Sequence, residues 1–160
     1  MQGTLTLNQI DTLLYNEDIG RIGYQLDNRL YITPINYVYD GQNISAYSLY
    51  GSKLQAMRQN PDVCFQVDHI IDSVHWQSVL TWGRFEELAG NDALKSMHLL
   101  IQHNIVSIAS GKSLHQFIQT ANYQRGSDTQ NIFVYRIHLF KKTGKFEQDE
   151  SSAHHKVNPQ

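Results

Sequence analysis

The chain of 160 residues contains a single cysteine, Cys64, and only three prolines. One cysteine cannot form a disulfide within the chain, nor can it build a cysteine-based zinc site. Cys64 lies in an apolar segment and is therefore expected to be an inert, buried thiol. The sequence also contains no GxGxxG segment and no serine nucleophile elbow, so it lacks these two signatures of dinucleotide binding and of hydrolysis.

Net charge and long apolar runs are scarce as well. The formal net charge is −2 with neutral histidines, which gives no general attraction to nucleic acid or to acidic membranes. The first residues lack the basic and apolar regions of a secretory signal, and no stretch is apolar enough to span a bilayer. We therefore expect a cytoplasmic protein that binds neither nucleic acid nor membrane.

The length suits one domain, assigned to residues 1–147, followed by a polar tail over 148–160 that is expected to be disordered. Residues 1–5 are expected to be frayed. Alternating and β-branched segments predict strands over residues 19–26, 30–40, 44–48, 63–70, 75–88 and 131–147. About six strands in hairpin order, joined by short helices, predict an antiparallel barrel of the α+β or mainly-β class.

Helical spacing of apolar residues predicts four helices. Thr6 is expected to cap the first, which ends near Asn16, and Asn91 to cap the third. The second begins with Ser52 and ends before Pro61, since a proline disfavours helix in the residue that precedes it. A fourth helix is predicted over residues 113–121.

Gly51, Ser52 and Lys53 stand between a strand and the second helix. One interpretation is a capped helix start, in which Gly51 permits the turn and Ser52 and Gln55 have capping-box spacing. The other is an anion site, because a helix N-terminus presents unpaired N–H groups to which a hydroxyl and an ammonium would add charge-assisted hydrogen bonds. The spacing alone leaves both interpretations open.

Two further segments carry polar and aromatic groups on strands. In "TPINYVYD", Pro34 cannot donate to a ladder, so this strand is expected at an edge or at a bulge, with backbone groups free for a heteroaromatic ligand. In "HWQSVLTWGR", Trp76 and Ser78 are candidate contacts to such a ring, and a bend is expected at Gly83. Both sets of aromatic residues are also compatible with an ordinary core or interface. His69 and His75 lack a third ligand, so no metal site is predicted.

Taken in order, five segments resemble one family: GRIGY, YITPINYVYDGQNI, YGSKLQAMRQNPDVCFQVD, WQSVLTWGRFEEL and VYRIHLFKKTGKF. They are similar to the pyridoxamine 5′-phosphate oxidase-related flavin-binding proteins, and most of all to their nitroimidazole-resistance-like subgroup. The resemblance runs from about residue 10 to residue 147. It implies a split β-barrel and a homodimer with FMN at the subunit interface.

The resemblance also implies roles for individual residues. Ser52 and Lys53 match the segment that grips the FMN phosphate, and Ala46 and Tyr47 match the strand residues just before it. Ser78 matches a polar residue at the pyrimidine edge of the flavin ring. The strand that lies against the ring is matched by five residues, namely Thr33, Pro34, Ile35, Asn36 and Tyr37.

The chain departs from the family pattern in three places. Tyr47 stands where the nitroimidazole-resistance-like proteins usually have a histidine. The phosphate-gripping Arg-Lys pair of pyridoxamine phosphate oxidase is Ser52-Lys53 here. No Arg- and His-bearing segment of the kind that this oxidase uses on its substrate follows "KKTGKFEQDE". Oxidation of vitamin B6 is therefore not expected.

The resemblance implies an FMN-dependent oxidoreductase that passes electrons from a donor, such as NAD(P)H, to a small planar acceptor, such as a nitroaromatic. The alternative is a flavin-binding carrier, sensor or storage module without turnover. No side chain is a clear catalytic group, and Tyr47 is the only candidate. The residues leave open which donor and acceptor are used, and whether haem or a deazaflavin replaces FMN.

Overall fold

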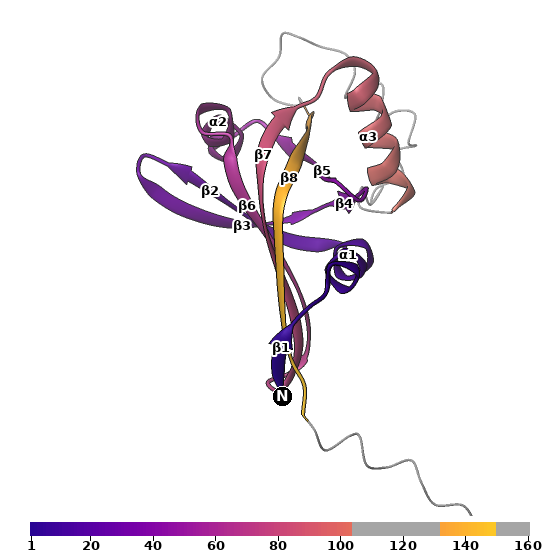
Figure 1. Ribbon diagram of the computed structural model, residues 1–160. Coiled ribbons are helices and arrows are strands. Elements are labelled where there is room, and N and C mark those ends of the chain that lie inside the picture. The colour runs from indigo at the N-terminus through magenta and orange to yellow at the C-terminus, as the bar shows by residue number, and fades with distance from the viewer. Residues whose placement is uncertain (104–131, 150–160) are drawn as a thin grey trace, which may run out of the picture.

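The computed structural model describes residues 1–103 and 132–149 (Figure 1). This part of the chain forms eight strands and three helices. The strands are β1 (Gln2–Thr4), β2 (Ile19–Leu26), β3 (Arg29–Asn36), β4 (Val38–Tyr39), β5 (Asn43–Leu49), β6 (Asp62–Asp72), β7 (His75–Glu87) and β8 (Ile132–Glu147). The helices are α1 (Leu7–Asn16), α2 (Ser52–Gln59) and α3 (Gly90–Gln102). None of these helices has the length and apolarity needed to cross a bilayer.

The strands form one antiparallel sheet in the order β3-β2-β6-β7-β8-β5-β4, and β1 pairs separately with β8. The sheet curls so that edge strand β3 contacts β5, which gives the split barrel that the sequence predicts. The expectation of a frayed start is wrong, because Gln2, Gly3 and Thr4 pair with Glu147, Phe146 and Lys145. The predicted helix over 113–121 and residues 150–160 of the tail lie outside the described residues.

The edge position predicted for the proline-containing strand is confirmed. Pro34 pairs with Arg21 of β2, and none of the strands in the described ranges follows β3 on its other side in the sheet order. A proline has no N–H to donate, so an edge is where it disturbs a ladder least. The hairpin between β2 and β3 turns at Asp27 and Asn28, whose φ angles of 50° and 60° suit these two residue types.

The cap predictions for the helices have mixed outcomes. At α1 the capping box is confirmed, since the Gln9 N–H donates to Thr6 Oγ1 at 3.3 Å and the Thr6 N–H donates to Gln9 Oε1 at 2.8 Å. At α2 and α3 the predicted caps are wrong. The N-cap residues are Gly51 and Ala89, neither of which makes a side-chain cap, so Ser52 and Asn91 lie inside their helices.

Two apolar clusters hold these elements together. The larger fills the barrel between the sheet, α1 and α2, and its completely buried side chains include Leu14, Ile22, Leu54, Met57 and Phe65. The smaller lies under α3, where Met97 and Leu100 meet Val38 and Val134. The two clusters pack on opposite faces of β5, because neighbouring side chains of a strand point to opposite sides.

Tyr135 is completely buried in the barrel, and its hydroxyl has no hydrogen-bond partner among the described residues. A buried polar atom without a partner costs about 1–3 kcal/mol. Tyr135→Phe is therefore expected to leave the free energy of unfolding unchanged or to raise it by about 1 kcal/mol. Urea denaturation of the flavin-free protein at one fixed concentration measures this difference.

Tyr37→Phe is the matched control for this substitution. Tyr37 is also buried, but its hydroxyl donates to the Leu14 carbonyl at 2.9 Å, near the C-terminus of α1. Removing that hydroxyl leaves a buried acceptor unpaired, so we expect a loss of about 1–3 kcal/mol. If Tyr135→Phe destabilised the protein as much as Tyr37→Phe does, the Tyr135 hydroxyl would have a partner after all.

Candidate flavin site

The start of α2 forms an exposed corner directly after β5. The Gly51 carbonyl accepts the Gln55 N–H at 3.1 Å, which begins the helix, and the N–H groups of its first turn have no partners within the helix. The sequence predicted that Gly51 permits this turn. Its backbone is extended, however, with φ 172°, a conformation that any residue can adopt, so the turn does not require a glycine. A Cβ atom added at Gly51 would meet nothing within 4 Å, so open space lies beside this helix start.

Lys53 lies in the first turn of α2 and is half-buried. Burial lowers the pKa of its ammonium group, because the charged form loses hydration. The ammonium has no ion pair or hydrogen bond with any of the described residues. A cation in this situation gains more from an incoming anion than a fully hydrated surface lysine does. The corner therefore has the donors, the charge and the space that a phosphate needs.

The five residues predicted on the proline-containing strand divide between the two faces of the sheet. Ile35 and Tyr37 are buried in the barrel core, and Thr33 faces the same side, where its Oγ1 lies 3.4 Å from the Tyr24 hydroxyl. Burial raises the pKa of Tyr37, helped by the charges of Glu17 and Asp18. These side chains are thus occupied. The Tyr37 backbone N–H also donates to the Asp18 carbonyl at 3.1 Å, so a ligand could use only the remaining backbone groups here.

Pro34 and Asn36 lie on the outer face of the same strand, where both are exposed. The register places Pro34 opposite Arg21, Arg21 opposite Gln66, and Gln66 opposite Leu80. Residues that are directly opposite one another share a face of a sheet. Pro34 therefore belongs to one continuous outer surface that reaches across β2 and β6 to β7.

Ala46 and Tyr47 are neighbours on β5 and point in opposite directions. Ala46 is completely buried in the barrel core. Tyr47 is partly buried and packs against the smaller cluster under α3. Its hydroxyl makes no hydrogen bond to a described residue. Ala46 can therefore offer a ligand only its backbone, and the Tyr47 side chain lies on the α3 side of the sheet.

Trp76 and Ser78 lie on the outer face of β7, beside a cavity of about 340 Å³ that is bounded by β6, β7 and β8. Gln66, across the sheet on β6, also lines this cavity, and its Nε2 donates to Ser78 Oγ at 3.1 Å and to Asp68 Oδ1. Gln66 is a candidate site residue that the sequence did not predict. Its position beside Ser78 depends on the register between β6 and β7, which residue spacing does not give.

The residues predicted for the two ends of the FMN, Ser52 and Lys53 on α2 and Trp76 and Ser78 on β7, lie far apart within one chain. Ser52 and Lys53 belong to α2. This helix is joined to the C-terminal end of β7 by an ion pair, in which Arg58 donates to Glu87 through Nε–Oε2 at 2.8 Å and Nη2–Oε1 at 2.9 Å. Ser78 lies nine residues from Glu87 along β7, or roughly 30 Å at about 3.3 Å per residue. In Figure 1, α2 lies at one end of the long β7–β8 pair, and β1 with the end of β6–β7 lies at the other.

The remaining candidates make local contacts. His69 Nδ1 lies 2.8 Å from Glu17 Oε1, and His75 Nδ1 lies 2.9 Å from both carboxylate oxygens of Asp72. In the described ranges, no three His, Cys, Asp or Glu side chains are placed to hold a metal ion. Cys64 is only partly buried, so its expected full burial is wrong.

A family model named pyridoxamine 5′-phosphate oxidase matches residues 6–145, which is most of the 160-residue chain. The chain belongs to the pyridoxamine 5′-phosphate oxidase family. The family resemblance that the sequence predicts is therefore confirmed.

Two solved structures illustrate the similarity of the fold. A FAD-binding protein of Mesorhizobium loti is 25% identical with a TM-score of 0.71, covering 93% of this chain and 98% of that one. A candidate 5-nitroimidazole antibiotic resistance protein of Bacteroides thetaiotaomicron is 16% identical with a TM-score of 0.66, over 94% and 92% of the two chains. At an identity of 16%, this second match shows only that the two proteins share a fold.

Among curated sequences, an uncharacterized protein of Rhizobium meliloti (strain 1021) is 35% identical over 71 residues, which are 44% of this chain. The matched segment spans about half of that relative, 47% of its length. This relative adds no activity to the family assignment.

Proposed function

We propose that this member of the pyridoxamine 5′-phosphate oxidase family is a homodimeric flavoprotein that binds FMN and acts as a flavin-dependent oxidoreductase. The observation that carries the proposal is Lys53, a half-buried cation without a counter-charge among the described residues, at the first turn of a helix without a side-chain cap. The FAD-binding protein of Mesorhizobium loti, similar over nearly its whole length, supports a flavin as the ligand.

The corner at α2 suits a phosphate for three independent reasons. The first-turn N–H groups lack partners within the helix, the Lys53 ammonium lies beside them, and open space adjoins Gly51. Ser52, exposed at the first helical position, adds a hydroxyl that can donate to a phosphate oxygen. In this proposal Lys53 and Ser52 hold the phosphate, and the FMN ring extends toward the outer face of β3.

Dimerisation would join the two separated groups of predicted residues into one site. Lys53 of one subunit and Ser78 and Trp76 of the other could then hold opposite ends of one FMN. The outer face of the sheet supports this, because Ile32, Ile70 and Leu30 expose 74%, 67% and 84% of their surface there. Exposed apolar patches of this kind mark interaction surfaces.

When bound, the flavin would supply the redox chemistry, which lies beyond the reach of side chains alone. The side chains of this chain would bind and orient it. The side-chain oxygens of Ser78 and Gln66 would accept hydrogen bonds from the ring edge, and the apolar outer face would exclude water from the ring. The proposed donor is NAD(P)H, and the proposed acceptor is a small planar molecule such as a nitroaromatic.

A second candidate is a flavin carrier, sensor or storage protein without turnover. One observation favours it: Tyr47, the only candidate for a catalytic group, packs against the cluster under α3. Its side chain thus lies on the α3 side of β5, and its hydroxyl makes no hydrogen bond to a described residue that could tune it for proton transfer.

Anaerobic stopped-flow absorbance separates the two candidates. Purified protein is loaded with FMN, mixed with NADPH or NADH, and then mixed with a nitroaromatic. We expect the absorbance near the flavin maximum to bleach with the donor and to recover with the acceptor. If the flavin stays oxidised with every donor tested, the oxidoreductase function is contradicted and the function as a carrier, sensor or storage protein is favoured. Chromatography of the flavin released by denaturing the protein as purified, before any FMN is added, identifies it as FMN or FAD.

A further inference from the structure

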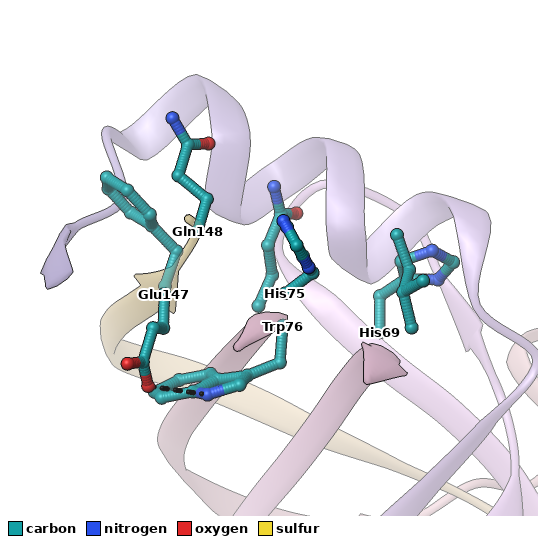
Figure 2. A pocket seen from close by; sticks show the side chains of 8 residues that line it. His69, His75, Trp76, Glu147 and Gln148 are labelled. Carbon is teal, nitrogen blue, oxygen red and sulfur yellow. Dashed lines mark hydrogen bonds between the residues drawn. The ribbon is translucent and has the colours of Figure 1, made fainter. Parts of the chain in front are cut away.

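The cavity of about 340 Å³ on the outer face is large enough for a molecule of one aromatic ring and its substituents, since benzene fits an engineered cavity of about 150 Å³. Trp76 also lines a smaller hollow of about 130 Å³, together with His69 and His75, which Figure 2 shows. Its lining combines apolar and polar side chains: Gln66, Trp76, Ser78, Leu80, Thr143 and Lys145.

The apolar part of this cavity is flat and fixed. The Trp76 indole Nε1–H donates to Glu147 Oε2 at 3.1 Å, as the dashed line in Figure 2 shows. This bond holds the ring plane, and Leu80 adds an apolar surface two steps along the same face of β7, beyond Ser78. A planar ligand can stack against such a surface with little loss of side-chain freedom.

The polar part is also fixed, and it offers a donor. Asp68 accepts hydrogen bonds from Arg21 Nη1 at 3.0 Å and from Gln66 Nε2, while the second N–H of Gln66 is directed to Ser78 Oγ. Because the Ser78 oxygen accepts from Gln66, its own hydrogen remains available to a ligand. Both carboxylates close to the cavity, Asp68 and Glu147, are already engaged.

Among the described residues that line the cavity, Lys145 is the one with a charged side chain. It lies directly opposite Ser78 in the register of β7 and β8. Its ammonium has no ion pair in the part of the chain that the structure describes. Lys142, three residues away, differs in this respect, because its Nζ lies 2.6 Å from Asp11 Oδ1. The charge, the donor and the flat wall together favour an anionic, planar ligand.

We propose that this cavity binds a one-ring aromatic carboxylate, and that Lys145 sets the preference for the anion over a neutral ring. The proposal rests on the proposed function, in which such a molecule is the acceptor and lies next to a flavin ring contacted by Ser78. Lys145 is then the residue that determines specificity for this class of acceptor.

The test uses 4-nitrobenzoate and nitrobenzene, which share ring and nitro group and differ in the carboxylate. Isothermal titration calorimetry measures their dissociation constants for the protein with and without bound FMN. In the FMN-loaded protein we expect 4-nitrobenzoate to bind about tenfold more tightly than nitrobenzene, the effect of one charge-assisted contact. Lys145→Ala is expected to abolish this preference and leave nitrobenzene binding unchanged.

Two controls make the result specific. Lys145→Arg keeps the charge and should keep the preference, and Lys95→Ala removes an exposed lysine of α3 and should change neither constant. Equal constants for the two probes in the unmodified protein would overturn the proposal, as would a 4-nitrobenzoate site that Lys145→Ala leaves intact. Binding of 4-nitrobenzoate only without FMN would also overturn it, since the flavin itself would then fill the cavity.

Failure of the proposed function has a different signature. If calorimetry detects no binding of FMN, the proposal of a flavoprotein is contradicted, whatever dissociation constants the two probes give. If the protein binds FMN but binds the two probes equally, the flavoprotein proposal stands and only the proposed carboxylate preference is contradicted.

Discussion

Lys53→Ala is expected to weaken FMN binding by about 1.5–3 kcal/mol, which is roughly a tenfold to 150-fold rise in the dissociation constant. The reason is the loss of a charge-assisted hydrogen bond to the phosphate from an ammonium that is half-buried and otherwise unpaired among the described residues. Fluorescence titration of the flavin-free protein with FMN measures the change. Riboflavin, which lacks the phosphate, should bind the variant and the unmodified protein equally.

Lys95→Ala is the matched control, because it removes one positive charge from an exposed position on α3. We expect its FMN affinity to stay within a factor of two of that of the unmodified protein. Equal losses of FMN and riboflavin affinity in Lys53→Ala would indicate a disturbed fold and not a phosphate contact. An unchanged FMN affinity in Lys53→Ala would place the phosphate elsewhere.

Gly83→Ala is expected to lower the free energy of unfolding by about 3 kcal/mol, as severe overpacking does. Gly83 is buried at the point where the pairing of β7 with β8 shifts register, between Trp82 and Gly83. A Cβ there would lie 2.5 Å from Ile137 Cγ2 and 2.7 Å from the His138 carbonyl oxygen. The second atom is backbone in the neighbouring strand, so it cannot move aside as a side-chain end could.

Gly51→Ala provides the control for Gly83→Ala, since a Cβ at Gly51 meets nothing within 4 Å and the backbone there is extended. Its unfolding free energy should stay within about 0.5 kcal/mol of the original. Urea denaturation without flavin, at one protein concentration, compares the three proteins. A Gly83→Ala protein as stable as Gly51→Ala would mean that the two long strands separate locally at little cost.

The strands could be predicted from the sequence because each carries its own pattern of alternating or β-branched residues. The edge position of Pro34 followed from the chemistry of a single residue, and the structure confirms it. At Gly83, where a bend was expected, the pairing of β7 with β8 shifts register. β1 could not be predicted, because Gln2–Thr4 is a strand only through its pairing with β8. Local propensity contains no information about a partner so far away in the sequence.

The helix caps and the candidate site show the same limit. Thr6 and Gln9 cap α1 through neighbours in sequence, so their motif was sufficient. At α2 the path of the chain decides that Gly51, and not Ser52, takes the cap position. The hydroxyl and the ammonium could be recognised as a candidate anion site from their order alone. Gln66 could not be recognised, because only the β6–β7 register brings it beside Ser78.

A crystal structure of the FMN-loaded protein tests the central claim most directly. It should show a dimer in which the phosphate accepts hydrogen bonds from backbone N–H groups of the first turn of α2 and from the Lys53 ammonium. The ring should lie between that corner and Ser78 of the partner subunit. A phosphate bound anywhere else, or solvent alone at the start of α2 beside a bound flavin, would contradict it.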